Sequence, residues 1–272
     1  MRIAVWDEPA LDFFARAAEE LAAHHKLTVV RLPRRPLRDT LVGGEVDIAL
    51  LPTLSVFLDH ELFDVLPAVA ISSWDFPFLK LNLRKGIGQP IDSIWIDPSL
   101  AQEALVTKVI LKEHYDLSPS FKPFVGDLAE AAKLQDLEGT LVKTTGNIPE
   151  LKEGVSIDLG RDWFELTNYP MVWGLFAMRN GEASGRAVNI IRDIASYTEL
   201  RREEWLAEED MPEELHKFYK EGLRYRLDDL ATASITSFQD YLYYNDAVDD
   251  MAPLPFYEVP EGEADGDDGP LL

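Results

Sequence analysis

The segment Val46–Leu51 (VDIALL) places the strongest limit on the fold, because it is a nearly continuous apolar run that ends at Pro52. Such a run is typical of a strand that is buried on both faces, as in a parallel sheet covered by helices. Strand patterns at Arg2–Trp6 and Leu27–Leu32 precede it, and apolar residues at helical spacing lie between them over Ala10–His24. This alternation predicts βαβ units and an α/β fold with mainly parallel sheets.

The middle of the chain carries its own set of strand and helix patterns. Strands are expected at Ser93–Ile96 and Gly139–Thr144, and a helix over Pro98–Tyr115 with Ser99 as its N-cap. The chain then returns through Pro170 to long helical patterns at Glu182–Ser196, Arg201–Leu206, Pro212–Tyr225 and Asp228–Asn245. We therefore expect one lobe from residues 1–90 and 170–260, a second lobe from residues 91–169, and a ligand cleft between them.

Charge narrows the range of partners. The chain of 272 residues has a formal net charge of −23, so its field repels nucleic acid and anionic membranes. Part of the acidity lies in residues 261–272, which have little to bury and are expected to be a disordered tail. We expect no nucleic-acid partner and no membrane partner. A solvated acidic surface and a high-salt habitat both remain open as reasons for the charge.

Other features bear on compartment and chemistry. The chain has no cysteine, which excludes disulfides, thiolate nucleophiles and zinc–cysteine sites. Its first residues carry Asp7, Glu8 and Asp12 and lack the positive start of a secretory signal, so we expect a cytoplasmic protein. The five histidines are not at metal-ligand spacing, and no phosphate-binding or dinucleotide-binding glycine motif is present. We therefore expect no metal and no cofactor.

Two lysines stand out in so acidic a chain. Lys80 lies on an alternating strand pattern near the first crossing between the lobes, and Lys143 ends an apolar strand. A lysine at a strand end in a cleft can anchor a carboxylate. The alternative is a side chain whose apolar stem packs while its amine reaches solvent.

Hydroxyls and aromatic rings supply further candidates. The helix start at Ser99, and Thr53 and Ser55 after the VDIALL strand, could offer polar groups to an anion or could simply cap helices. Tyr169 and Trp173 could wall a pocket for a ring-shaped ligand or could belong to the core.

Three blocks of sequence are recognisable: GEVDIALLP (Gly44–Pro52), IDLGRDWFELTNYPMVWGLF (Ile157–Phe176) and LRYRLDDLATASITSFQDYL (Leu223–Leu242). They resemble the chorismate dehydratases of the futalosine route to menaquinone. The resemblance implies a two-lobed fold like that of type II periplasmic binding proteins. It also implies that the chain removes water from chorismate to give 3-(1-carboxyvinyloxy)benzoate, with no metal or cofactor.

The chain departs from the family at the positions expected to touch the ligand. Asp7 and Glu8 lie where the family has a Tyr-Leu-Asn loop, and Lys80 lies where it has serine. The other departures are Ala101-Gln102-Glu103 in place of Arg-Thr-Ser, and Thr145-Gly146-Asn147 in place of Ile-Gly-Asp.

Two hypotheses follow. In the first, the chain is a dehydratase with a rearranged pocket, in which Lys80 and Lys143 hold carboxylates with help from Ser99 and Gln102. Asn147 and Thr145 orient the leaving hydroxyl, and Trp173 flanks the ring. In the second, the same cleft belongs to a non-catalytic binding protein, or to an enzyme that acts on another substrate. Both expect a small-molecule ligand, a carboxylate in the first case, and both leave a homodimer open.

Overall fold

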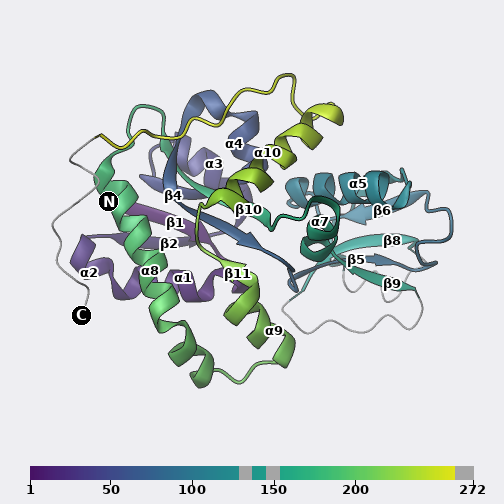
Figure 1. The fold of residues 1–272 in the computed structure, drawn as a ribbon, viewed down its shortest axis with the longest axis horizontal. Coiled ribbons are helices and arrows are strands. Elements are labelled where there is room, and N and C mark those ends of the chain that lie inside the picture. Colours follow the sequence, from purple (N-terminus) through teal and green to yellow (C-terminus); the bar gives the residue numbers. More distant parts are fainter. Residues whose placement is uncertain (129–136, 145–153, 261–272) are drawn as a thin grey trace.

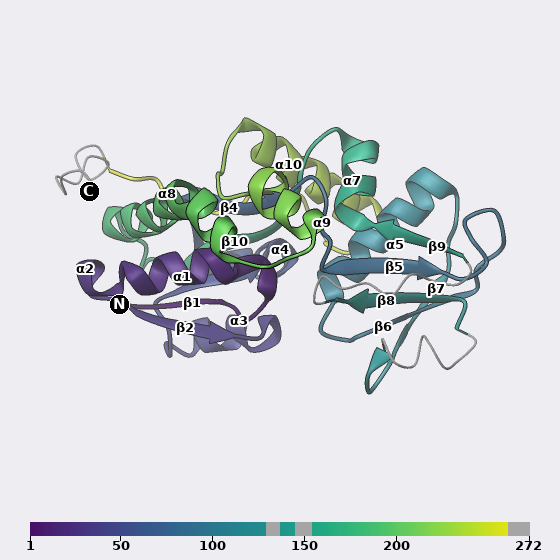
Figure 2. The ribbon, with the colours of Figure 1, turned by 90° about the horizontal axis from the view of Figure 1, so that it is seen from below.

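The computed structural model describes residues 1–128, 137–144 and 154–260. The chain forms two β-sheets with helices packed around them, and the two sheets lie beside each other along the length of the molecule (Figures 1 and 2). The acidic tail expected at residues 261–272 falls outside the described part. No helix in the described ranges is long and apolar enough to cross a membrane.

The first sheet has the strand order β11-β4-β10-β3-β1-β2. Its strands are β1 (Arg2–Trp6), β2 (Thr28–Leu32), β3 (Ile48–Pro52), β4 (Phe63–Ser73), β10 (Met171–Arg179) and β11 (Leu223–Arg224). The predicted parallel pairing is confirmed for these βα units, since β1 lies between β2 and β3 and is parallel to both. The apolar run in β3 is buried because β1 and β10 lie on its two sides and α3 (Arg34–Val42) packs over it.

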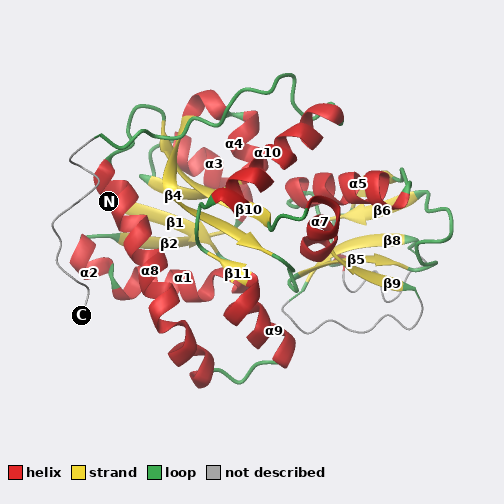
Figure 3. Cartoon of the chain, in the orientation of Figure 1, coloured by secondary structure: helices red, strands yellow, loops and turns green. Residues whose placement is uncertain are grey.

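Helices from both ends of the chain cover this sheet (Figure 3). They include α1 (Asp12–Glu20), α4 (Thr53–Leu58), α8 (Gly185–Glu208) and α10 (Asp229–Tyr244). The shorter helices α2 (Ala22–His25) and α9 (Glu213–Lys217) and the 3₁₀ turns η1 (Pro9–Leu11) and η2 (His60–Leu62) complete this part of the chain. The two helices expected between residues 182 and 206 are one helix, α8. The helix expected over Pro212–Tyr225 is confirmed in part. It is present as α9 and a π-helical turn up to Gly222, and the chain then forms β11, which pairs with β4.

The second sheet has the strand order β7-β6-β8-β5-β9. Its strands are β5 (Leu79–Leu83), β6 (Ser93–Ile96), β7 (Ser120–Pro123), β8 (Gly139–Lys143) and β9 (Val155–Asp158). The helices α5 (Ala101–Tyr115) and α7 (Leu159–Thr167) pack against each other beside it (Figure 1).

Both sheets are mixed rather than mainly parallel. In the first sheet β10 is antiparallel to β3 and β4, and in the second β5 is antiparallel to β8 and β9. The cause is the path of the chain, which leaves the first sheet after β4 and re-enters it through β10 running the opposite way to β3. β5 pairs with β8 and β9, so the chain passes from the first sheet to the second between β4 and β5, which we call the first crossing.

The start of α5 differs from the expectation for Ser99. The helix begins at Ala101, its N-cap is Leu100, and no side chain caps it. The backbone N–H of Ser99 donates to Asp97 Oδ1 at 2.8 Å, so Ser99 belongs to the turn before the helix. Ser99 as an N-cap is therefore wrong.

The recognisable block around Asp158 has a clear structural use. The carboxylate of Asp158 caps α7 by accepting from the N–H groups of Gly160 and Arg161, and it also accepts from Phe76 N at 2.8 Å. A Cβ at Gly160 would lie 2.7 Å from the carbonyl carbon of Asp75. Because glycine has no side chain, α7 can touch the backbone of the segment between β4 and β5.

We predict that Gly160→Ala lowers the free energy of unfolding by about 1–2 kcal/mol, because a backbone contact cannot move aside as a flexible side chain can. The loss should appear although alanine favours helix formation by about 1 kcal/mol over glycine. Urea denaturation measures it. Gly88→Ala is the control, since a Cβ there meets nothing within 4 Å. Equal stability of the two variants would contradict the contact.

Candidate functional site

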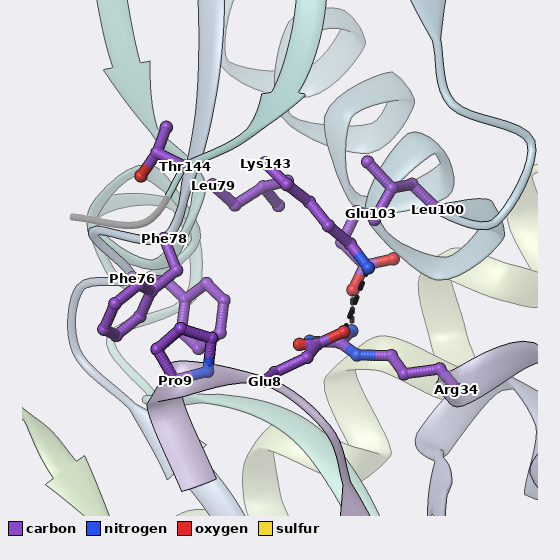
Figure 4. Close-up of a pocket in the computed structure, with 10 residues that line it drawn as sticks. All are labelled: Glu8, Pro9, Arg34, Phe76, Phe78, Leu79, Leu100, Glu103, Lys143 and Thr144. Atoms are coloured by element: carbon purple, nitrogen blue, oxygen red, sulfur yellow. Dashed lines mark hydrogen bonds and ion pairs between the residues drawn. The ribbon is translucent and has the colours of Figure 1, made fainter. Parts of the chain in front are cut away.

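A small pocket lies between the parts of the chain that carry the two sheets (Figure 4). Its cavity volume is about 40 Å³, which leaves room for only a few water molecules. Glu8, Pro9 and Arg34 come from the first-sheet side, and the segment after β4 and the second-sheet side supply Phe76, Phe78, Leu79, Leu100, Glu103, Lys143 and Thr144.

Arg34 is the central charged group of this pocket. It is the first residue of α3, it is only 6% exposed, and its guanidinium lies 3.9 Å from the ring centre of Trp6. Its Nη2 donates to Glu8 Oε2 at 2.5 Å, and its Nη1 donates to Glu103 Oε1. Glu103 is 2% exposed and lies in the first turn of α5, so a buried arginine of the first-sheet side is held by a carboxylate of the second.

Lys143 makes a second contact between the two sides, from a cation of the second-sheet side to a carboxylate of the first. It ends β8 on the second-sheet side, and its Nζ donates to Glu8 Oε1 at 3.0 Å. Burial raises the pKa of Glu8, but the charges of Arg34 and Lys143 and their hydrogen bonds outweigh it, so the pKa lies below its ordinary value. Glu8 is therefore an anion at neutral pH, held by a cation from each side of the cleft.

We define these four residues, Glu8, Arg34, Glu103 and Lys143, as the cleft quartet. Two cations and two carboxylates balance within it. Each carboxylate contacts a cation of the opposite side, and Glu8 also contacts Arg34 on its own side. The quartet therefore fastens the two sides together through the chain's own charges.

One face of the pocket is apolar. Phe76 and Phe78 stand edge to face with ring centres 6.0 Å apart, and Leu79 and Leu100 continue the surface. Trp173, which was expected to flank a ligand, is fully buried behind this wall, with its ring 4.5 Å from Phe76. Its Nε1 donates to Ser73 Oγ at 2.8 Å, so its polar atom is already used.

Lys80, expected to touch the ligand, lies outside the pocket lining. Its Nζ is 2.7 Å from Asp158 Oδ2, and both side chains are 9% exposed. Glu214 of α9 is a further 3.6 Å contact. The geometry makes Lys80 the partner of the carboxylate that caps α7 and holds the first crossing.

Gln102 and Thr53 also lie outside the lining and tie backbone together. Gln102 accepts from Leu54 N and donates to Trp173 O, both at 2.8 Å, which links α5 to α4 and β10. Thr53 Oγ1 donates to Val172 O at 2.9 Å.

The remaining predicted residues divide into two groups. Asp7 is exposed beside Arg31, and Ser55, Ser99 and Tyr169 are half-buried residues that do not line the pocket. Thr145 and Asn147 lie outside the described residues, so their roles stay predictions. Of the predicted set, Glu8 and Lys143 line the pocket.

Sequence reasoning missed Arg34, Phe76 and Phe78. The pattern of α3 is polar, and it gives no sign that the first arginine of the helix is buried. Two phenylalanines flanking Pro77 at a lobe crossing were the available signal for an aromatic wall. No group of three or more residues suited to hold a metal is found in residues 1–128, 137–144 and 154–260.

Comparisons with known proteins bear on the family and the fold. A family model described as menaquinone biosynthesis matches residues 1–244. No curated protein matches the chain. Among solved structures, protein AF1704 from Archaeoglobus fulgidus is 17% identical with a TM-score of 0.64, over 91% of this chain and 98% of that one.

Two sulphonate-binding proteins are similar in the same way. The periplasmic aliphatic sulphonate binding protein SsuA from Escherichia coli is 13% identical with a TM-score of 0.66, over 96% of this chain and 92% of that one. The alkanesulfonate-binding protein SsuA from Xanthomonas axonopodis pv. citri, bound to MOPS, is 12% identical with a TM-score of 0.64, over 93% and 96%. The chain has the periplasmic-binding-protein fold, as the resemblance implied.

We predict that Glu8→Gln lowers the free energy of unfolding by about 1–2 kcal/mol at pH 7, because charge-assisted hydrogen bonds to two cations are weakened. The folded-state pKa of Glu8 is lowered, so this stabilisation is complete above the ordinary value of 4.5 and is lost as the pH falls through the folded value. Denaturation at stepped pH should show the wild-type advantage shrinking toward zero in acid. An advantage that does not change with pH would contradict this assignment.

Lys80→Met should lower the free energy of unfolding by about 3 kcal/mol, since it leaves the buried Asp158 without its cation. Lys85→Met is the control, because Lys85 is 53% exposed and its contact with Glu138 is at the surface. Thermal and urea denaturation of the two variants decide the matter. If Lys80→Met is as stable as Lys85→Met, the structural role given to Lys80 is wrong.

Proposed function

The chain belongs to the menaquinone-biosynthesis family, and on that premise we propose that it is a carbon–oxygen lyase that removes water from chorismate to give 3-(1-carboxyvinyloxy)benzoate. The match over residues 1–244 is the observation that carries the proposal, because it spans both sides of the pocket. The proposal includes a cytoplasmic location and a small-molecule carboxylate ligand, and it leaves a homodimer open.

The types of side chain in the pocket support this proposal. The reaction removes one hydrogen and one hydroxyl from the ring as water, and the ring becomes aromatic. Such a step needs a substrate held in one orientation and groups that stabilise the developing charge. Arg34 and Lys143 are the cations in the described lining, and Phe76 and Phe78 offer a surface for the ring. Asn147 and Thr145 stay predicted as the groups that orient the hydroxyl.

The proposal requires the cleft to open. A site for a small molecule has a volume of about 300–1,000 Å³, far above the 40 Å³ found here. The two sides would separate to admit chorismate, and the charges of the cleft quartet would rearrange around its carboxylates.

A second candidate function is favoured by the acidic half of the quartet. Glu8 and Glu103 oppose a ligand with two negative charges, and together they neutralise the two cations. This would suit a binding protein without catalysis, or an enzyme acting on a ligand with less negative charge.

Incubation of the purified protein with chorismate tests the proposal, with the product followed by liquid chromatography. We predict turnover well above the protein-free reaction, and a fall of about tenfold or more in kcat/KM for Lys143→Met, which removes a cation from the pocket. Lys143 is 42% exposed, so this variant should fold.

Lys108→Met is the matched control, because Lys108 is an exposed lysine of α5 outside the pocket lining. Its kcat/KM should equal that of the wild type. Absence of product, together with no change in melting temperature on adding chorismate, would rule out the dehydratase and leave the second candidate.

A further inference from the structure

Two features of the pocket call for an explanation. It has room for only a few water molecules, and Glu8 fills the space between two cations, one from each side. In addition, Nε of Arg34 is buried and has no hydrogen-bond partner among the described residues. A buried guanidinium with an unused N–H costs free energy. A state in which another group accepts a hydrogen bond from that N–H is therefore favoured by comparison.

We propose that Glu8 occupies the place of a ligand carboxylate in the unliganded chain, and that a ligand binds by replacing Glu8 between Arg34 and Lys143. This inference deepens the proposed function. It rests on that function only because both concern the same pocket. Arg34 is then the residue that recognises the ligand, and Glu8 is a competitor built into the protein.

The surroundings of the four residues decide which one moves. Arg34 is fixed by its stacking on Trp6 and by Glu103, whose side chain is 2% exposed within α5. Glu8 lies in the segment between β1 and η1, outside any helix or strand. A change in its side-chain torsions can carry its carboxylate out of the pocket without disturbing a regular element.

Charge balance requires the same exchange. Arg34 and Lys143 are matched by Glu8 and Glu103 in the closed pocket. A carboxylate that entered while Glu8 remained would give a desolvated site with one excess negative charge, which is strongly disfavoured. When Glu8 leaves for solvent, the incoming carboxylate restores the balance. The lowered pKa of Glu8 means that it competes as an anion at neutral pH.

The vacated position also defines the chemical class of the ligand. An arginine edge made of Nη2 and the unused Nε can donate two parallel hydrogen bonds to a planar carboxylate. Lys143 would add a third donor from the opposite side. Phe76 and Phe78 bound the pocket with aromatic surface, so a carboxylate attached to an unsaturated ring fits best.

Benzoate is a suitable probe because it has one carboxylate and one ring and cannot undergo the dehydration. Isothermal titration of the full chain at neutral pH would compare the wild type with Glu8→Gln, which keeps the shape of the side chain and removes its charge. We expect Glu8→Gln to bind benzoate about tenfold more tightly or better, since the internal ion pairs no longer compete.

The chain offers a closely matched control. Arg16 also stacks on a tryptophan, Trp205, at 4.7 Å, and also contacts two glutamates, Glu20 and Glu208. Glu208→Gln therefore makes the same change of charge beside an arginine with the same kinds of contact, at the protein surface and outside the pocket lining. It should bind benzoate as the wild type does. The double variant Glu8→Gln/Lys143→Met should lose the gain.

Three results would overturn the inference: no benzoate binding to Glu8→Gln, equal affinity of Glu8→Gln and the wild type, or the same gain in Glu208→Gln. The outcome is separate from that of the chorismate assay. A gain in Glu8→Gln without turnover of chorismate would leave this inference standing and reject the dehydratase. Turnover of chorismate without the gain in benzoate affinity would support the dehydratase and reject this inference.

Discussion

The arrangement of the two sides of this protein depends on one buried guanidinium. Arg34 is 6% exposed, and burying an arginine is tolerated only when carboxylates neutralise it and accept its hydrogen bonds. One of those carboxylates, Glu103, lies across the cleft, and the other, Glu8, is shared with Lys143 across the cleft. Satisfying Arg34 therefore requires the two sides to be close together. Closure follows from the electrostatics of the chain itself, before any ligand is considered.

The rest of the junction supports the same closed arrangement through neutral and buried contacts. Gln102 bridges α5 to backbone groups of the first-sheet side, so it adds hydrogen bonds that an open cleft would lose. Asp158 joins Lys80, the start of α7 and the backbone of Phe76, which makes the region of the first crossing stiff. The polar residues around the crossings thus position the pocket and its charged residues.

The sequence was sufficient for the fold and for part of the pocket. The VDIALL strand and the βα alternation were visible because burial on both faces leaves a local mark in the pattern of apolar residues. Lys143 was found because it ends such a strand. Lys80 was expected to touch a ligand, and its partner Asp158 is remote in sequence, so no local pattern could show the pair. Arg34 was missed for the same reason, since its burial depends on Glu103, which lies on α5 beside the second sheet. Residues that act across an interface leave little trace in the local sequence.

The most direct test of this account is a distance across the cleft in the absence of ligand. The chain has no cysteine, so Arg35→Cys on α3 and Lys108→Cys on α5, both exposed, can carry a pair of spin labels without further changes. Double electron–electron resonance would then compare the labelled protein with and without Glu8→Gln. The account predicts one narrow distance distribution when Glu8 is present, and a longer or broader one when its charge is removed. Identical distributions in the two proteins would show that the charge of Glu8 does not hold the two sides together.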